Sequence, residues 1–398
     1  MNLPADRYTR IDALRGLAVF GILLVNIWSF VWGFEPMRYG ILQPDATLAD
    51  MLSIAFVAFF AEQKFYPIFA FLFGASFVLI TQSIKRSTGK WSDAKRLYRR
   101  RLRWLLGCGV LHGTLIWFGD VLTLYSIAGF WVLAGLAGAR LRAIVASLRN
   151  WAIVFVILVV SGFLLNVLLL NAGSMASQAA AAVESVQMAN FIYTQGSLFG
   201  IAWQRLNDYA AVTTQSIFIL PHVAVLFLLG VLSVRRRWLT QPWRHRTFWR
   251  RTQWIGLAIG IPFNLLWATL KLTEVIDPLD PSMLDYALYS LLAVGGSCLA
   301  AAYVATFMLA GDGIMQPLQR WLAPVGRMAL THYLTQSLVC AVLLQGFGFG
   351  LGATLSPSGL IALAFAIMLL QTVWSRWWFA HHEQGPLEIL SRRMINRN

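Results

Sequence analysis

Long apolar stretches recur along the whole chain and constrain its fold more than any other feature. A bilayer core about 30 Å thick needs roughly 20 apolar residues of helix to cross it. Only 12% of the residues are charged, whereas soluble domains carry about 25%. The sequence therefore predicts an all-α polytopic membrane helix bundle, one integral membrane domain over residues 1–398. The expected crossings, about ten, lie near 15–33, 60–82, 102–119, 121–138, 151–170, 212–233, 254–272, 285–309, 324–346 and 359–379.

Basic residues are concentrated in alternate connections between these stretches. Lys and Arg number 32 against 17 Asp and Glu, and they gather in the connections 83–103 and 234–251. Because short cytoplasmic loops are rich in Lys and Arg, we expect both termini in the cytoplasm and residues 171–207 as the longest outer loop. The surplus thus indicates topology and contact with anionic membrane lipids, and it argues against nucleic acid as a partner. Residues 51–61 are expected to form an interfacial helix.

Polar side chains inside the crossings are candidates for function, because each costs a few kcal/mol unless it is paired or hydrated. Asp12 and Arg15 share one helical face at the cytoplasmic start of the first crossing and are expected to pair. Asn26 lies about 16 Å deeper on the same helix. Lys64 precedes the second crossing, where it can meet an anionic group or extend to the lipid headgroups. A simple positively charged anchor is the alternative interpretation of the first helix.

A histidine and an aspartate flank the predicted turn between the third and fourth crossings. His112 lies between Gly109 and Gly113, which permit close helix approach. Asp120 follows two helical turns later, and Tyr125 begins the next crossing. This spacing predicts a proton-handling pair beside an outward cavity. A single interhelical histidine bonded to a carbonyl is the alternative.

A further helix is unusually rich in hydrogen-bonding side chains between residues 326 and 337. It carries Arg327 and His332, with Tyr333 and Gln336 close by. Such a helix must face the interior of the bundle or water. A substrate path and a purely structural polar seam both account for it.

Several short segments, in the same order along nearly the whole chain, carry a resemblance to a known family. They are 12–16 with Asn26, 69–74, 111–113 with 119–120, 325–331 and 384–388. Together they resemble the YeiB-like family, the bacterial domain of unknown function numbered 418. That family is similar to multi-spanning acyltransferases such as the lysosomal heparan glucosaminide acetyltransferase and bacterial glycan O-acyltransferases.

The resemblance implies that acyl-CoA is used from the cytoplasm and that its acyl group reaches a glycan, lipid or small-molecule acceptor at the cell envelope, across a bacterial inner membrane. Acyl transfer needs a base that takes the acceptor proton, and His112 with Asp120 is expected to supply this catalytic function. The expected substrate-binding residues are Asp12, Arg15, Asn26, Lys64, Tyr125, Arg327 and His332, and the expected contacts for the phosphates of coenzyme A are Arg99, Arg100 and Arg103. Relatives of the lysosomal type place a catalytic histidine in the outer loop after the first crossing, and residues 34–50 contain none.

Two other classes of function compete with acyl transfer. A transporter or exporter uses the same polar residues within the membrane, although no internal repeat marks an inverted-repeat transporter. A non-catalytic scaffold or sensor needs none of them. We expect His112 to line a water-filled passage with a basic inner opening, and we predict no metal site because no histidine pair has ligand spacing. The sequence leaves the oligomeric state open.

Overall fold

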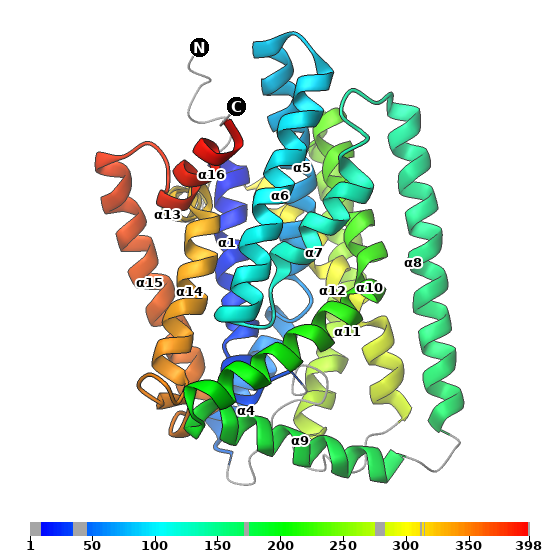
Figure 1. The fold of residues 1–398 in the computed structure, drawn as a ribbon. Helices are drawn as coiled ribbons and strands as arrows, with labels where there is room; N and C mark the ends of the chain where they lie inside the picture. The colour runs from blue at the N-terminus through cyan, green and yellow to red at the C-terminus, as the bar shows by residue number, and fades with distance from the viewer. Residues whose placement is uncertain are drawn as a thin grey trace.

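A computed structural model describes residues 9–34, 46–170, 175–274, 283–310, 313 and 315–396, and its regular elements are all helical in these ranges (Figure 1). In chain order the elements are α1 (Thr9–Asn26), α2 (Ser29–Trp32), α4 (Leu48–Phe60), α5 (Phe65–Thr88), α6 (Trp91–Leu115), α7 (Val121–Ala128), η2 (Gly129–Leu133), α8 (Leu141–Leu170), α9 (Met175–Gln195), α10 (Leu198–Arg235), η3 (Pro242–His245), α11 (Arg246–Glu274), α12 (Met283–Leu309), α13 (Gln316–Arg327), α14 (Ala329–Leu344), η4 (Leu351–Ala353), α15 (Pro357–His381) and α16 (Pro386–Asn396). The predicted all-α membrane bundle is confirmed.

Helices long and apolar enough to cross a membrane number 7 in the described residues, and each matches one of the predicted crossings. The other predicted crossings are divided differently. Residues 102–115 of the third predicted crossing belong to α6, whose first half is basic. Residues 121–133 of the fourth fall on the shorter helices α7 and η2. Residues 324–346 are divided between α13 and α14 at Met328, where the backbone leaves the helical conformation.

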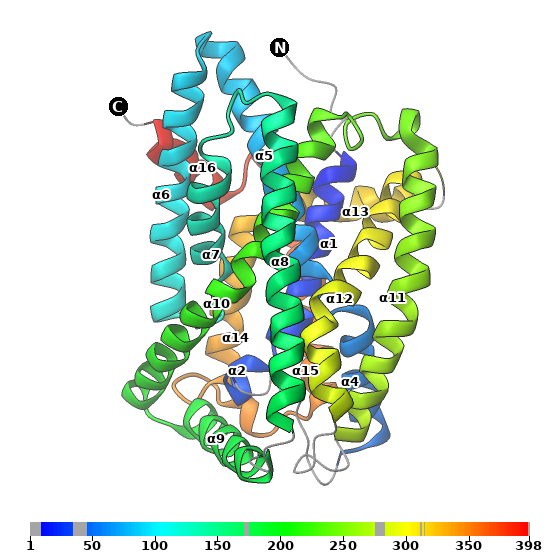
Figure 2. The same cartoon turned by 90° about the vertical axis from the view of Figure 1, so that its right-hand side faces the viewer.

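The first helix begins, and the last one ends, at the same end of the bundle (Figures 1 and 2). The turn between α5 and α6 lies at this end too, and it carries part of the basic connection 83–103. The predicted outer loop 171–207 is largely helical, since α9 lies across the opposite end and α10 begins at Leu198. Residues 171–174 of that loop lie outside the described residues.

Residues 51–61 are the segment that was expected to form an interfacial helix. These residues belong to α4, which packs lengthwise against α11 and α15 and leads into α5 through a short break (Figure 2). Gln63 in this break adopts a positive φ of 61°. Together α4 and α5 make up one candidate crossing, Leu48–Thr88.

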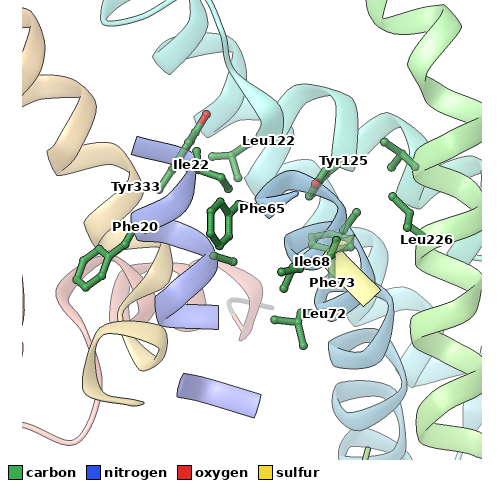
Figure 3. Packing of buried hydrophobic residues seen from close by; sticks show 14 of the residues in the cluster. Phe20, Ile22, Phe65, Ile68, Leu72, Phe73, Leu122, Tyr125, Leu226 and Tyr333 are labelled. Carbon is green, nitrogen blue, oxygen red and sulfur yellow. The ribbon is translucent and has the colours of Figure 1, made fainter. Parts of the chain in front are cut away.

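Small residues bring α5 and α10 into backbone contact. A Cβ atom on Gly74 would lie 2.0 Å from the Phe227 carbonyl oxygen, and one on Gly230 would lie 1.9 Å from that of Phe71. Such contacts increase van der Waals packing in a membrane, where lipid tails compete for apolar surfaces. Phe65, Phe73 and Tyr125 fill the core beside these helices (Figure 3).

The helices α6 and α7 form a hairpin that enters the bundle from the end carrying the termini and returns to that end. Its turn stops well short of the lower end of α8 (Figures 1 and 2). The first half of α10 packs against both arms of the hairpin. The residues of the turn are thereby held inside the protein.

Candidate functional site

A histidine and an aspartate meet at the turn of the α6–α7 hairpin. His112 is in the last turn of α6, and Asp120 is the N-cap of α7. Nδ1 of His112 lies 2.9 Å from Oδ1 of Asp120, and the other carboxylate oxygen accepts the Thr123 backbone N–H at 2.7 Å. The capping bond thus fixes the carboxylate that orients the imidazole.

The second nitrogen of the imidazole has different surroundings from the first. A carboxylate accepts hydrogen bonds, so the bonded Nδ1 carries the proton in the neutral ring and Nε2 keeps its lone pair. His112 is 2% exposed, and Nε2 has no hydrogen-bond partner. A buried polar atom without a partner is costly, so this atom is available to a ligand proton.

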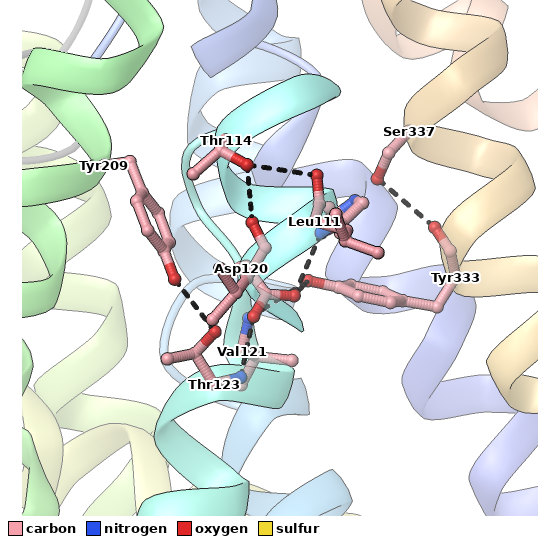
Figure 4. A network of polar contacts seen from close by, with 10 residues as sticks. Leu111, Thr114, Asp120, Val121, Thr123, Tyr209, Tyr333 and Ser337 are labelled. Carbon is pink, nitrogen blue, oxygen red and sulfur yellow. Dashed lines mark hydrogen bonds and ion pairs between the residues drawn. The ribbon is translucent and has the colours of Figure 1, made fainter. Parts of the chain in front are cut away.

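An aromatic side chain from α14 completes the site, and it was not among the predicted catalytic or substrate-binding residues. The Tyr333 hydroxyl accepts the Val121 N–H at 3.1 Å and lies 3.5 Å from Oδ1 of Asp120 (Figure 4). Its ring centroid is 5.0 Å from that of His112. Tyr333 follows His332 directly in the polar stretch of α14. The sequence alone does not show which of these two side chains faces the α6–α7 hairpin.

The other walls come from α6, α10 and the turn. A Cβ atom on Gly109 would lie 2.6 Å from Oδ2 of Asp120, so the glycine permits the carboxylate to approach α6. The Tyr209 hydroxyl lies 3.1 Å from Oγ1 of Thr123 (Figure 4). Trp117 packs edge-on to His112 with 6.1 Å between ring centroids. These contacts hold both members of the pair in place.

The predicted pair in the first helix forms, but at a separate place. Nη1 of Arg15 lies 2.7 Å from Oδ1 of Asp12, and its Nη2 donates to Oγ of Ser76 at 3.0 Å. Asn26 ends α1 nearer the hairpin turn. Its carbonyl accepts a hydrogen bond from Ser29, whose hydroxyl accepts one from Trp117.

Two predicted substrate-binding residues have other surroundings. Lys64 is 0% exposed, and its Nζ donates to the Ala58 carbonyl at 2.6 Å. The expectation that Lys64 extends to the headgroups was therefore wrong, because the break after α4 turns it inward. Tyr125 donates to the Tyr66 carbonyl at 2.8 Å and packs in the aromatic core with Phe73, its ring centroid 5.6 Å away.

The two predicted residues near α14 also face away from His112. His332 is buried against α15, with Nε2 2.6 Å from Oγ of Ser375. Arg327 is exposed and lies over the Phe379 ring, 3.9 Å from its centroid. His332 therefore belongs to a polar seam between α14 and α15.

The predicted coenzyme contacts lie on the basic half of α6. Arg99 and Arg103 are exposed and Arg100 is half-buried. A cavity of about 320 Å³ lies elsewhere, at the start of α8, and is lined by Leu141, Arg142, Val145, Ala146, Arg149 and Arg236.

The burial of the His112 side chain differs from the expectation that this residue lines a water-filled passage. The turn of the hairpin is closed over this imidazole, so the site is enclosed in this conformation.

Comparison with known proteins identifies the family of this chain. Residues 233–398 match the family described as "Protein of unknown function (DUF418)", and the chain is 31% identical to the uncharacterized protein YxaH of Bacillus subtilis (strain 168) over 98% of its length and 94% of that protein. The chain belongs to this family. It is also 28% identical to the uncharacterized protein YeiB of Escherichia coli (strain K12), over 98% of this chain and 97% of that protein. No solved structure matches it. The family resemblance seen in the sequence is thus confirmed, and it extends over both the hairpin and α14.

Proposed function

We propose that this DUF418 protein is a membrane-bound acyltransferase that moves an acyl group from cytoplasmic acyl-CoA to a hydroxyl or amine acceptor at the cell envelope. The observation that carries the proposal is the buried Nε2 of His112, which has no partner while Asp120 holds Nδ1. Acyl transfer needs a base that takes the acceptor proton during attack on the thioester. An imidazole oriented by a carboxylate is well suited to this step.

The proposed reaction assigns a role to each side chain of the pair. Nε2 of His112 removes the proton of the acceptor as its oxygen or nitrogen bonds to the thioester carbonyl carbon. The carbon–sulfur bond then breaks, and the imidazolium returns the proton to the thiolate of coenzyme A. Asp120 stabilises the imidazolium between these events. Tyr333 positions the carboxylate through its contacts with Asp120 and Val121.

Access to His112 requires movement of the structure around the hairpin turn. Tyr209 and the first half of α10 contact this turn, and Trp117 and Tyr333 pack against the imidazole. Opening of these contacts admits substrate, and their closure excludes water that would hydrolyse the thioester.

The basic end of the bundle is assigned to the cytoplasm of a bacterial inner membrane. The rule that Lys and Arg gather in cytoplasmic loops supports this orientation. Both relatives named above are bacterial proteins. Arg99, Arg100 and Arg103 lie on this end and attract anionic donors and lipid headgroups.

A transporter or exporter is the second candidate, favoured by the polar seam between α14 and α15. There the Gln336 side chain donates to Oε1 of Gln371 at 2.7 Å, and His332 bonds Ser375. A scaffold or sensor, the third candidate, requires neither the seam nor the hairpin pair.

Purified protein in phospholipid vesicles with labelled acetyl-CoA separates these candidates. The proposal expects transfer of the label, or slow hydrolysis, and loss of both in His112→Gln at normal protein levels. Uptake or counterflow of solute that depends on His332, without any use of acetyl-CoA, supports transport. Absence of turnover with acetyl-, succinyl- and longer acyl-CoAs contradicts the proposed acyltransferase activity.

A further inference from the structure

One arginine of the basic run on α6 faces the interior of the bundle. Arg99 and Arg103 are exposed, whereas Arg101 lies on the same side as the buried residues Tyr98 and Leu102. Its guanidinium is 5.6 Å from the centroid of the Phe73 ring. Helical spacing thus directs one positive charge of this run toward α5 and α1.

The polar atoms on this face of α6 lack partners. Nη1 of Arg101, the hydroxyl of Tyr98 and Nε1 of Trp104 are all buried without a hydrogen-bond partner. All three can donate a hydrogen bond, and they follow one another at intervals of three residues. A buried donor left without an acceptor costs about 1–3 kcal/mol, and more when it is charged. The Tyr98 hydroxyl and the Arg101 guanidinium are close enough to interact with each other, but Nη1 of Arg101 and Nε1 of Trp104 still lack an acceptor.

A charge of the same sign lies close to Arg101. Arg15 is close enough to repel it electrostatically, and the Asp12 carboxylate is already bonded to Arg15. No carboxylate in the described part of the chain forms a salt bridge with Arg101. Both guanidinium groups contact the same stretch of α5, since Arg15 bonds Ser76 and Arg101 lies over Phe73 one helical turn earlier. Two neighbouring guanidinium groups in a partly buried place are stabilised by an anion between them.

We infer that Arg101 and Arg15, with the Tyr98 hydroxyl, form a binding site for a phosphate group at the cytoplasmic end of the bundle, between α1, α5 and α6. Guanidinium groups bind phosphate oxygens through two parallel hydrogen bonds. The inference holds whether or not the protein transfers acyl groups. The phosphate comes from a soluble nucleotide-like ligand or from an anionic lipid headgroup, and the two sources share this chemistry.

The test measures thermal unfolding of the full chain in maltoside micelles while the anion is titrated. One arm uses inorganic pyrophosphate and coenzyme A, and the other uses phosphatidylglycerol against phosphatidylcholine. Arg101→Gln is expected to raise the apparent Kd of the stabilising anion at least about tenfold. Its unfolding temperature without anion stays equal or rises, because a repelled buried charge has been removed.

Arg96→Gln is the matched control, since it removes the same charge from an exposed position on the same helix. Its Kd is expected to stay within about twofold of the unaltered protein. Arg101→Lys keeps the charge but loses the two parallel hydrogen bonds of the guanidinium. Its apparent Kd is expected to lie between those of Arg96→Gln and Arg101→Gln. Stabilisation by pyrophosphate or coenzyme A identifies a soluble ligand, and stabilisation by phosphatidylglycerol alone identifies a lipid. Equal losses in Arg96→Gln and Arg101→Gln, or no stabilisation in either arm, overturn the inference.

Discussion

Gly109 lies directly against the Asp120 carboxylate, where a Cβ atom would come within 2.6 Å of Oδ2. The carboxylate cannot keep its present position if residue 109 has a side chain. The histidine pair therefore depends on a glycine one helical turn earlier as well as on its own two residues.

Gly109→Ala is expected to displace Asp120 and to lower the rate of acetyl transfer by about 10²-fold, since misplacement of a catalytic group by about 1 Å costs that much. Gly107→Ala provides the control. A Cβ atom there meets nothing within 4 Å, and alanine favours the helix by about 1 kcal/mol. Rates and unfolding temperatures of both variants test the prediction, and equal rates in the two would contradict it.

Asp120→Asn separates catalysis from stability. Asparagine is a good N-cap and retains the bond to Thr123, but it does not stabilise an imidazolium. We expect the transfer rate to fall by about 10²- to 10⁴-fold while the unfolding temperature changes little. Asp120→Ala is expected to lose the cap as well, at about 1 kcal/mol. Full activity of the Asp120→Asn variant would show that the carboxylate has no role in catalysis.

Tyr333→Phe keeps the ring beside His112 and removes the hydroxyl that contacts Val121 and Asp120. Loss of this group is expected to destabilise the protein by about 1 kcal/mol and to slow transfer. Tyr193→Phe is the control, because that buried hydroxyl donates to Asp208 at 2.7 Å in another part of the bundle. Chemical denaturation and transfer assays on both are required. A rate loss shared equally by the two variants would indicate general loosening.

The hairpin predicts a distinctive labelling pattern in intact cells. Single cysteines in a background with the native cysteines replaced by serine report which side each position faces. A membrane-impermeant maleimide is expected to react with Phe349→Cys, at an exposed position on the end opposite the termini. It is expected to react with Ser87→Cys only after permeabilisation. Ile116→Cys, at a half-buried position in the hairpin turn, is expected to react poorly in both cases because the turn stops inside the bundle. Rapid labelling of Ile116→Cys in intact cells would instead place the turn at the outer surface.

Local features of the chain were predictable from the sequence. Seven of the expected crossings match long apolar helices, because the length of an apolar stretch directly sets the length of a membrane helix. The contacts between His112 and Asp120 and between Asp12 and Arg15 were also predictable. These partners are eight and three residues apart, so a turn or a single helical face brings them together.

Tertiary structure alone determined which polar side chains share a site. Tyr333 reaches Asp120 while its neighbour His332 faces α15, since packing of α14 fixes its rotation about its own axis. Packing against α5 turns the half-buried Arg101 toward the interior, and the break between α4 and α5 buries Lys64. Sequence periodicity defines which residues lie on one face of a helix, but the neighbouring helices decide whether that face meets lipid, water or another polar group.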